Sequence, residues 1–149
     1  MQFTTNQLAD FNARLDKLTP QTKALWGNMR VEQMLAHMND AFRIALGMKA
    51  SVDGSNFITN KIVFPIAVYW LPQFPKNVST APELDQKQQG TPPRDFYTEL
   101  EFLKTMMDVF NEREPEKLKP HPMFGKLTKA QWRDLLVKHL SHHLKQFGV

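Results

Sequence analysis

Apolar side chains recur every three or four residues along four separate segments of this chain. That spacing matches an α-helix with one buried face, whereas a half-buried strand would alternate apolar and polar residues. No convincing alternating pattern occurs in the 149 residues. The clearest stripe is Phe96, Leu100, Leu103, Met107 and Phe110. We therefore predict an all-α chain with helices over roughly 6–18, 30–46, 94–113 and 128–147.

The connection between the second and third predicted helices is unusually long. Residues 58–71 are expected to form one or two short helices that are kinked or broken at Pro65. Residues 72–93 contain five prolines and are predicted to be a long excursion. Connections of this length in compact domains are usually functional. We expect a single helical-bundle domain over residues 1–149 with one long crossover between the second and third helices.

The composition excludes several classes of protein. The chain has no cysteine, so a disulfide scaffold, a cysteine zinc site and a cysteine nucleophile are ruled out. Lys and Arg number 19 against 15 Asp and Glu, for a formal net charge of +4, and no block of like charges occurs. Nucleic-acid binders usually concentrate their basic residues on one face or tail. We therefore expect no nucleic-acid partner.

The sequence shows no signal for export or for membrane insertion. The first residues lack a charged stretch followed by an apolar one, which a secretory signal would need. The most hydrophobic window, Ile62–Leu71, is interrupted by Pro65 and is far shorter than the roughly 20 apolar residues of a membrane span. We expect a cytoplasmic protein with no membrane partner.

Three of the five histidines are crowded into residues 138–145. His139 and His143 are four residues apart, so a helix places both imidazoles on one face, about one turn apart. A helical wheel puts His143 near the middle of the apolar arc, His139 close to it and His142 at its edge. Buried polar groups need partners, and a shared metal ion would be a suitable one.

A third ligand has to come from another helix, and His37 in the second predicted helix is the candidate. Three histidines leave at least one coordination position open, as in catalytic rather than structural metal sites. Imidazole suits Zn²⁺, Ni²⁺, Fe²⁺ or Cu²⁺, and the residues do not choose among them. We expect a divalent ion, Zn²⁺ or Ni²⁺ before Fe²⁺. The residues alone leave one alternative open, a hydrogen-bonded or surface histidine cluster without metal.

Other motifs carry less chemistry. His121 precedes a proline and is interpreted as a loop-packing residue. The chain contains no HExxH motif, no ExxH pair and no phosphate-binding glycine loop. The sequence therefore predicts candidate metal ligands but no candidate catalytic side chain.

Several strings of residues together resemble a known family. They are Leu25–Met29, Gln33–Met38, Phe74–Asn77 with Thr80–Glu83, His121–Thr128 and His139–Gly148. They span nearly the whole chain. In combination they resemble the DinB/YfiT-like superfamily of metal-dependent bundles, and within it a small bacterial family described only as a domain of unknown function.

The resemblance implies an antiparallel four-helix bundle with its long crossover between the second and third helices. It also implies a metal site with one histidine from the second helix and an HxxxH pair from the last, which correspond here to His37, His139 and His143. Characterised relatives include zinc-dependent thiol transferases and isomerases that use a low-molecular-weight thiol. The additional His142 and the proline-rich crossover depart from the wider superfamily pattern.

Two functions compete at this point. The first is a metal-dependent transferase or isomerase, in which the metal lowers the pKa of a thiol or water and residues 56–93 form the wall of a small-molecule pocket. The second is a non-catalytic binding or stress-response module that forms a homodimer through a helix face, with structural histidines. Nucleic-acid binding is the least favoured of the functions considered, because the basic residues form no patch through which it could act.

Overall fold

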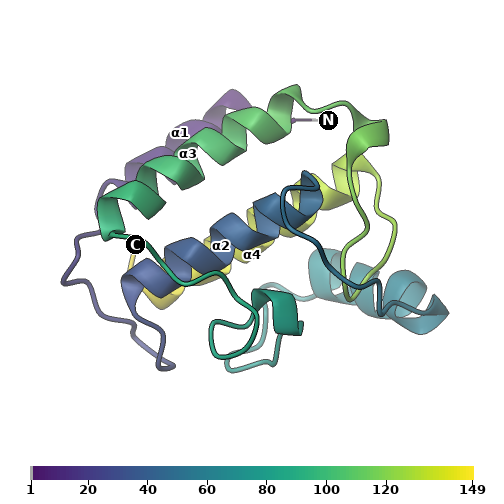
Figure 1. Ribbon diagram of the computed structural model, residues 1–149, viewed down its shortest axis with the longest axis horizontal. Coiled ribbons are helices and arrows are strands. Elements are labelled where there is room, and N and C mark those ends of the chain that lie inside the picture. The colour runs from purple at the N-terminus through teal and green to yellow at the C-terminus, as the bar shows by residue number, and fades with distance from the viewer. Residues whose placement is uncertain (1) are drawn as a thin grey trace.

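The computed structural model describes residues 2–149, and the regular secondary structure within this range is entirely helical. An isolated β-bridge joins His121 to Gly125. The predicted all-helical class is confirmed. The long helices are α1 (Thr5–Leu15), α2 (Val31–Ala45), α3 (Phe96–Glu112) and α4 (Lys129–Gln146), and they lie alongside one another (Figure 1).

The helices do not all alternate in direction. Asn39 of α2 bonds to Glu99 near the start of α3, and Phe42 further along α2 packs against Phe110 near the end of α3, so α2 and α3 are parallel. Lys129, which begins α4, bonds to the Asn111 carbonyl near the end of α3, so α4 runs the opposite way. The antiparallel arrangement expected from the sequence is therefore wrong for the α2–α3 pair, because the long crossover returns the chain to the end where α2 began (Figure 1).

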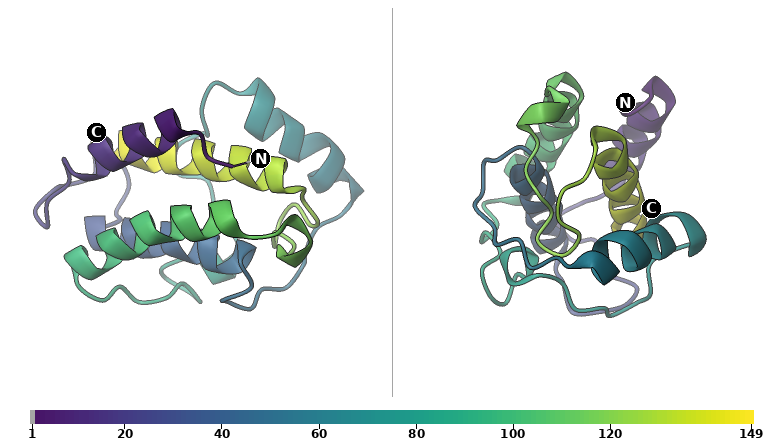
Figure 2. Two further views of the ribbon diagram at one scale, coloured as in Figure 1. Left: turned by 90° about the horizontal axis from the view of Figure 1, so that it is seen from above. Right: turned by 90° about the vertical axis from the view of Figure 1, so that its right-hand side faces the viewer.

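Two short π-helices form the first part of the crossover. They are η1 (Thr59–Val63) and η2 (Ile66–Trp70), short helices as the sequence predicted, but Phe64 and Pro65 between them are also helical, so the segment is not broken at Pro65. They project from one end of the molecule beside the long helices (Figure 2). Two shorter turns are 3₁₀-helical, η3 (Pro82–Leu84) in the crossover and η4 (Pro115–Lys117) after α3.

Local sequence accounts for where the long helices begin. Thr4 accepts a hydrogen bond from the Gln7 backbone while the Gln7 side chain accepts from the Thr4 backbone, which is a capping box. Thr128 and Gln131 form the same arrangement at the start of α4. These bonds satisfy backbone N–H groups that have no partner within the helix.

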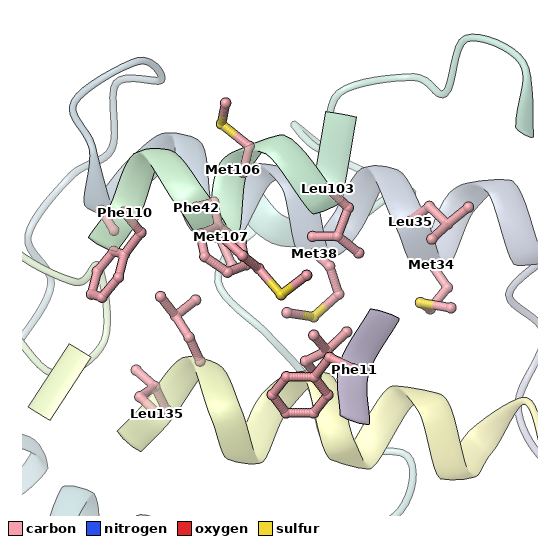
Figure 3. Packing of buried hydrophobic residues seen from close by; sticks show 14 of the residues in the cluster. Phe11, Met34, Leu35, Met38, Phe42, Leu103, Met106, Met107, Phe110 and Leu135 are labelled. Atoms are coloured by element: carbon pink, nitrogen blue, oxygen red, sulfur yellow. The ribbon is translucent and has the colours of Figure 1, made fainter. Parts of the chain in front are cut away.

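The core lies between the four long helices, and methionine and phenylalanine fill much of it (Figure 3). The predicted stripe of α3 is buried throughout. Flexible methionines suit such irregular spaces. The core residues with less than 1 % of their surface exposed include Met34, Met38, Phe42, Met107 and Phe110. Within the described part of the chain, no helix combines the length and apolar character needed to cross a bilayer.

A buried carboxylate fastens the later part of the crossover to α2. The Asp40 side chain is fully buried and accepts from Lys49 Nζ at 2.8 Å and from the backbone and hydroxyl of Thr91. Lys49 Nζ also donates to the carbonyls of Glu83 and Gln89. Burial raises the pKa of Asp40, but the bonds from Lys49 and Thr91 outweigh it and hold that pKa below its usual value. The crossover therefore has a fixed position on α2, one turn from His37.

Candidate metal centre

Three imidazoles from two helices converge between α2 and α4. The Nε2 atom of His139 lies 2.9 Å from His37 Nε2 and 3.1 Å from His143 Nε2. The ring centroids form a nearly equilateral triangle with sides of 4.8, 4.8 and 4.9 Å. His37 and His143 are buried and His139 is half-buried. The structure thus brings together the three residues that the sequence singled out.

The crossover fixes the tautomer of His37. Its Nδ1 atom lies 2.7 Å from the backbone carbonyl oxygen of Leu84. A carbonyl can only accept, so His37 Nδ1 carries the proton and donates it. In the neutral ring the lone pair is then on Nε2, which faces the other two histidines.

Gln146 fixes the tautomer of His143 in the same way. His143 Nδ1 lies 2.7 Å from Gln146 Oε1. The amide nitrogen of Gln146 donates to the Trp26 carbonyl at 3.0 Å, which leaves the amide oxygen to accept from His143. His143 Nε2 therefore also presents a lone pair to the centre of the cluster.

The three nitrogens cannot satisfy one another by hydrogen bonding alone. If His139 Nε2 carries a proton, one N–H faces two lone pairs, and if it does not, three lone pairs converge. A cation would resolve this conflict. Two imidazole nitrogens on tetrahedral zinc lie about 3.3 Å apart, from Zn–N bonds of about 2.0–2.1 Å. His139 Nε2 lies 2.9 and 3.1 Å from the other two nitrogens, and the three ligand atoms all lie within 4.8 Å of one another. These three histidines could therefore hold a metal ion.

Protonation does not resolve the conflict, because the charged forms are disfavoured. Burial, reinforced by the neighbouring imidazoles of His37 and His143, lowers the pKa of His139 well below its usual value. Burial likewise lowers the pKa of His143 well below its usual value and lowers that of His37. The cluster is thus neutral at pH 7, which is the form that ligates metals.

Aromatic and basic side chains surround the half-buried side of the cluster. The Phe74 ring lies 6.0 Å from that of His139 and 5.9 Å from that of His142, measured between centroids. Trp26 lies 5.8 Å from His142, and Lys76 Nζ sits 4.4 Å above the Trp26 ring. Phe74 belongs to the crossover, so that segment both orients His37 and lines the approach to His139.

Neither of the two remaining histidines joins the trio. The His142 ring is 5.2 Å from His143 but turns toward Trp26 and Phe74. His121 is buried in the loop before α4, where its Nδ1 accepts from the backbone N–H groups of Met123 and Phe124. The interpretation of His121 as a loop-packing residue agrees with these contacts.

Two groups that orient the histidine rings, the Gln146 side chain and the Leu84 carbonyl, were not predicted from the sequence. Gln146 could have been found, because it is three residues after His143 and therefore shares its helix face. The Leu84 carbonyl could not, because a backbone acceptor leaves no mark in the sequence. Such outer-shell partners fix ring orientation and raise the basicity of a histidine ligand.

A comparison with protein families matches residues 1–148 to the one described as "Protein of unknown function (DUF1569)". The chain belongs to this family. The DUF1569 match covers all three clustered histidines and both of their orienting partners. Comparisons with curated proteins and with solved structures gave no match. The DUF1569 description names no activity, so the functional interpretation depends on the chemistry of the histidine cluster.

Proposed function

We propose that this protein is a DinB/YfiT-like four-helix bundle that holds a divalent metal ion, Zn²⁺ or Ni²⁺ before Fe²⁺, through His37, His139 and His143. The observation that carries the proposal is the convergence of three Nε2 atoms whose lone pairs have no other partner. Two of these lone pairs are directed inward by proton donation from the opposite ring nitrogen. Three protein ligands leave a position free for a small molecule.

The chemistry we propose is transfer or isomerisation of a small molecule with a low-molecular-weight thiol as cosubstrate. A metal ion held by the trio would lower the pKa of a thiol or water at its open position. The chain has no cysteine, so any thiol must arrive as a ligand and meets no competing protein thiol. Phe74 would limit the access of water to His139, and α2 and α4 hold the three ligands rigidly.

A groove beside the centre offers space for a ligand. Its volume is about 280 Å³, and it lies between η2 with the residues after it and the outer face of α4. His142 and Lys138 contribute the polar side and Leu71 and Val137 the apolar side. The same crossover that carries Phe74 thus forms one wall, which supports the expectation that residues 56–93 line a small-molecule pocket.

Metal content is the direct test. Untagged protein should contain close to one equivalent of Zn²⁺, Ni²⁺ or Fe²⁺ by elemental analysis, and the His139→Ala, His143→Ala double variant should contain almost none. His142→Ala is the matched control, because His142 adjoins the cluster without presenting a nitrogen to it, and it should load normally. Full metal content in the double variant would overturn the metal site.

Activity is tested separately. The loaded protein should consume small electrophiles in the presence of low-molecular-weight thiols, and both EDTA and the double variant should abolish the turnover. A protein that loads metal but shows no thiol-dependent turnover across such a screen would contradict the transferase proposal and favour a non-catalytic module.

A further inference from the structure

The first part of the crossover exposes an unusual amount of apolar surface. Trp70 is 82 % exposed, Phe57 73 % and Ile58 59 %. The other large apolar side chains exposed in this segment are Ile62, Val63, Ile66, Tyr69 and Leu71. We call these eight residues the η1–η2 patch. Contiguous exposed apolar surface of this kind marks an interaction site in a folded protein.

The patch is presented by a well-anchored structure. Phe64 is fully buried and packs edge-on against Phe124, with ring centroids 5.3 Å apart, and Val68 is also buried. Asn60 donates to the Phe124 carbonyl, and Lys138 donates to the carbonyls of Val68 and Leu71. One face of η1 and η2 is therefore fixed to the protein while the apolar residues of the other face point to solvent. The two helices project at one end of the molecule (Figure 2).

The charges around the patch are mostly positive. Residues 54–82 contain no Asp or Glu, and their two charged side chains are Lys61, exposed on η1, and Lys76, whose ammonium lies over the Trp26 ring. Lys126 is exposed beside η1, where Asn60 lies close to its carbonyl, and Lys138 borders η2.

Two acidic groups lie near the patch, Asp134 and Asp53. Asp134 accepts from the Tyr69 hydroxyl at 3.0 Å and pairs with Arg133 at 2.5 Å. Asp53, at the start of the segment, is exposed and keeps its negative charge, because its bond from the Ser55 backbone at 3.0 Å does not neutralise it. Lys61, Lys126 and Lys138 outnumber it, so the net charge around the apolar residues is positive.

We propose that the η1–η2 patch docks this protein on an anionic lipid surface. Helices that lie in a membrane interface present Trp, Phe and aliphatic residues beside Lys, and they do so without spanning the bilayer. Here Trp70, Phe57 and Ile62 enter the headgroup region while Lys61 and Lys126 face anionic lipids. The sequence expectation of no membrane partner rested on the short apolar window, which excludes a span but does not bear on adsorption. The proposal is independent of the metal centre.

Charge is what favours a lipid surface over a second copy of this chain. A two-fold contact through the η1–η2 patch would bring the lysines of both copies together, with fewer unpaired acids than lysines to face them. Like charges brought together across an interface disfavour association. Anionic headgroups supply the missing negative charge.

The test is co-sedimentation of the full chain with vesicles. We expect binding to vesicles of equimolar phosphatidylcholine and phosphatidylserine, little binding to phosphatidylcholine alone, and weakening as salt is added. Trp70 emission should shift to shorter wavelength on binding. The Ile62→Ser, Trp70→Ser double variant should bind at least about tenfold more weakly, and Lys61→Gln about fivefold more weakly.

Tyr97→Ser is the matched control, because Tyr97 is a 65 % exposed aromatic residue on α3, outside the patch. It should bind the anionic vesicles as the unaltered protein does. Absence of binding to anionic vesicles at low salt would overturn the proposal. So would equal binding by the double variant. A dimer seen by sedimentation equilibrium and lost in the double variant, without vesicle binding, would assign the patch to a second copy.

Discussion

Single hydrogen bonds decide which atoms the histidine cluster presents. The imidazole of His37 would be free to place its proton on either nitrogen in solution, but the Leu84 carbonyl holds it on Nδ1. Gln146 does the same for His143. A cluster in which every ring could exchange tautomers would satisfy itself through a chain of N–H···N bonds. Because the tautomers of two of the three rings are fixed, this cluster has more nitrogen lone pairs facing its centre than N–H groups to bond them.

Gln146→Leu tests this argument directly. Leucine has a similar size but cannot accept the proton of His143 Nδ1, so the ring loses its orientation and its preferred tautomer. Loss of such an outer-shell partner typically weakens metal binding about 10–100-fold. Competition with a chromogenic chelator would measure the change in Kd.

The conservative variant separates orientation from packing. Gln146→Glu keeps an oxygen that accepts from His143 Nδ1, but it loses the bond to the Trp26 carbonyl and places a carboxylate oxygen against that carbonyl. Because His143 keeps its acceptor, this variant should bind metal more tightly than Gln146→Leu does. Unchanged affinity in Gln146→Leu, or an equal loss in both variants, would contradict the assigned role of Gln146.

At the scale of the elements, the sequence was informative where one face of a helix is buried. The stripe from Phe96 to Phe110 and the caps at Thr4 and Thr128 come from local rules, and the helices lie close to the predicted ranges, except that α1 ends at Leu15 and not near residue 18. The three clustered histidines could also be predicted, because helical spacing and burial select His139 and His143 together and the second helix offers His37. The position of the crossover on α2 could not be predicted from the sequence. It depends on Lys49 reaching backbone carbonyls 34 and 40 residues away, and no periodicity records such a contact.

Lys49→Met tests whether the crossover supports the metal centre. It removes one of the two cationic partners of the fully buried Asp40 carboxylate, and Arg43 stays paired with it at 3.1 Å. Breaking a buried ion pair outright typically costs about 3–5 kcal/mol, so the loss here should lie at the lower end of that range or just below it. The substitution also releases the segment that carries the Leu84 carbonyl, so metal affinity should fall as well. Urea unfolding and chelator competition would measure the two effects.

Lys104→Met is the control for this element. Lys104 also pairs with two carboxylates, those of Asp16 and Glu101, but both of these acids are more than 60 % exposed. Exposed pairs contribute about 0–1 kcal/mol, so this variant should unfold almost normally and keep its metal affinity. If Lys49→Met and Lys104→Met lowered the free energy of unfolding equally, the proposal that Lys49 anchors the crossover would be contradicted.

At the scale of the whole molecule, the buried histidines make folding depend on pH. Their pKa values are lowered in the folded chain, so below pH 6.5 the unfolded chain binds more protons than the folded one. Stability is therefore fully present above about pH 6.5 and is lost as the pH falls toward the folded-state values. The carboxyl groups with lowered pKa values, such as Asp40, add to this loss only below about pH 4.

His121 allows one part of this dependence to be isolated without touching the metal centre. Burial lowers its pKa to about 4, and its Nδ1 accepts two backbone N–H groups, a role that a protonated ring cannot fill. Between pH 7 and pH 5 it should contribute about 2 kcal/mol to the loss of stability. In His121→Asn the amide oxygen can replace Nδ1 as acceptor and does not titrate. Urea unfolding in EDTA at both pH values should then show a smaller loss for the variant, by about that amount, whereas parallel pH profiles would mean that His121 does not titrate with folding.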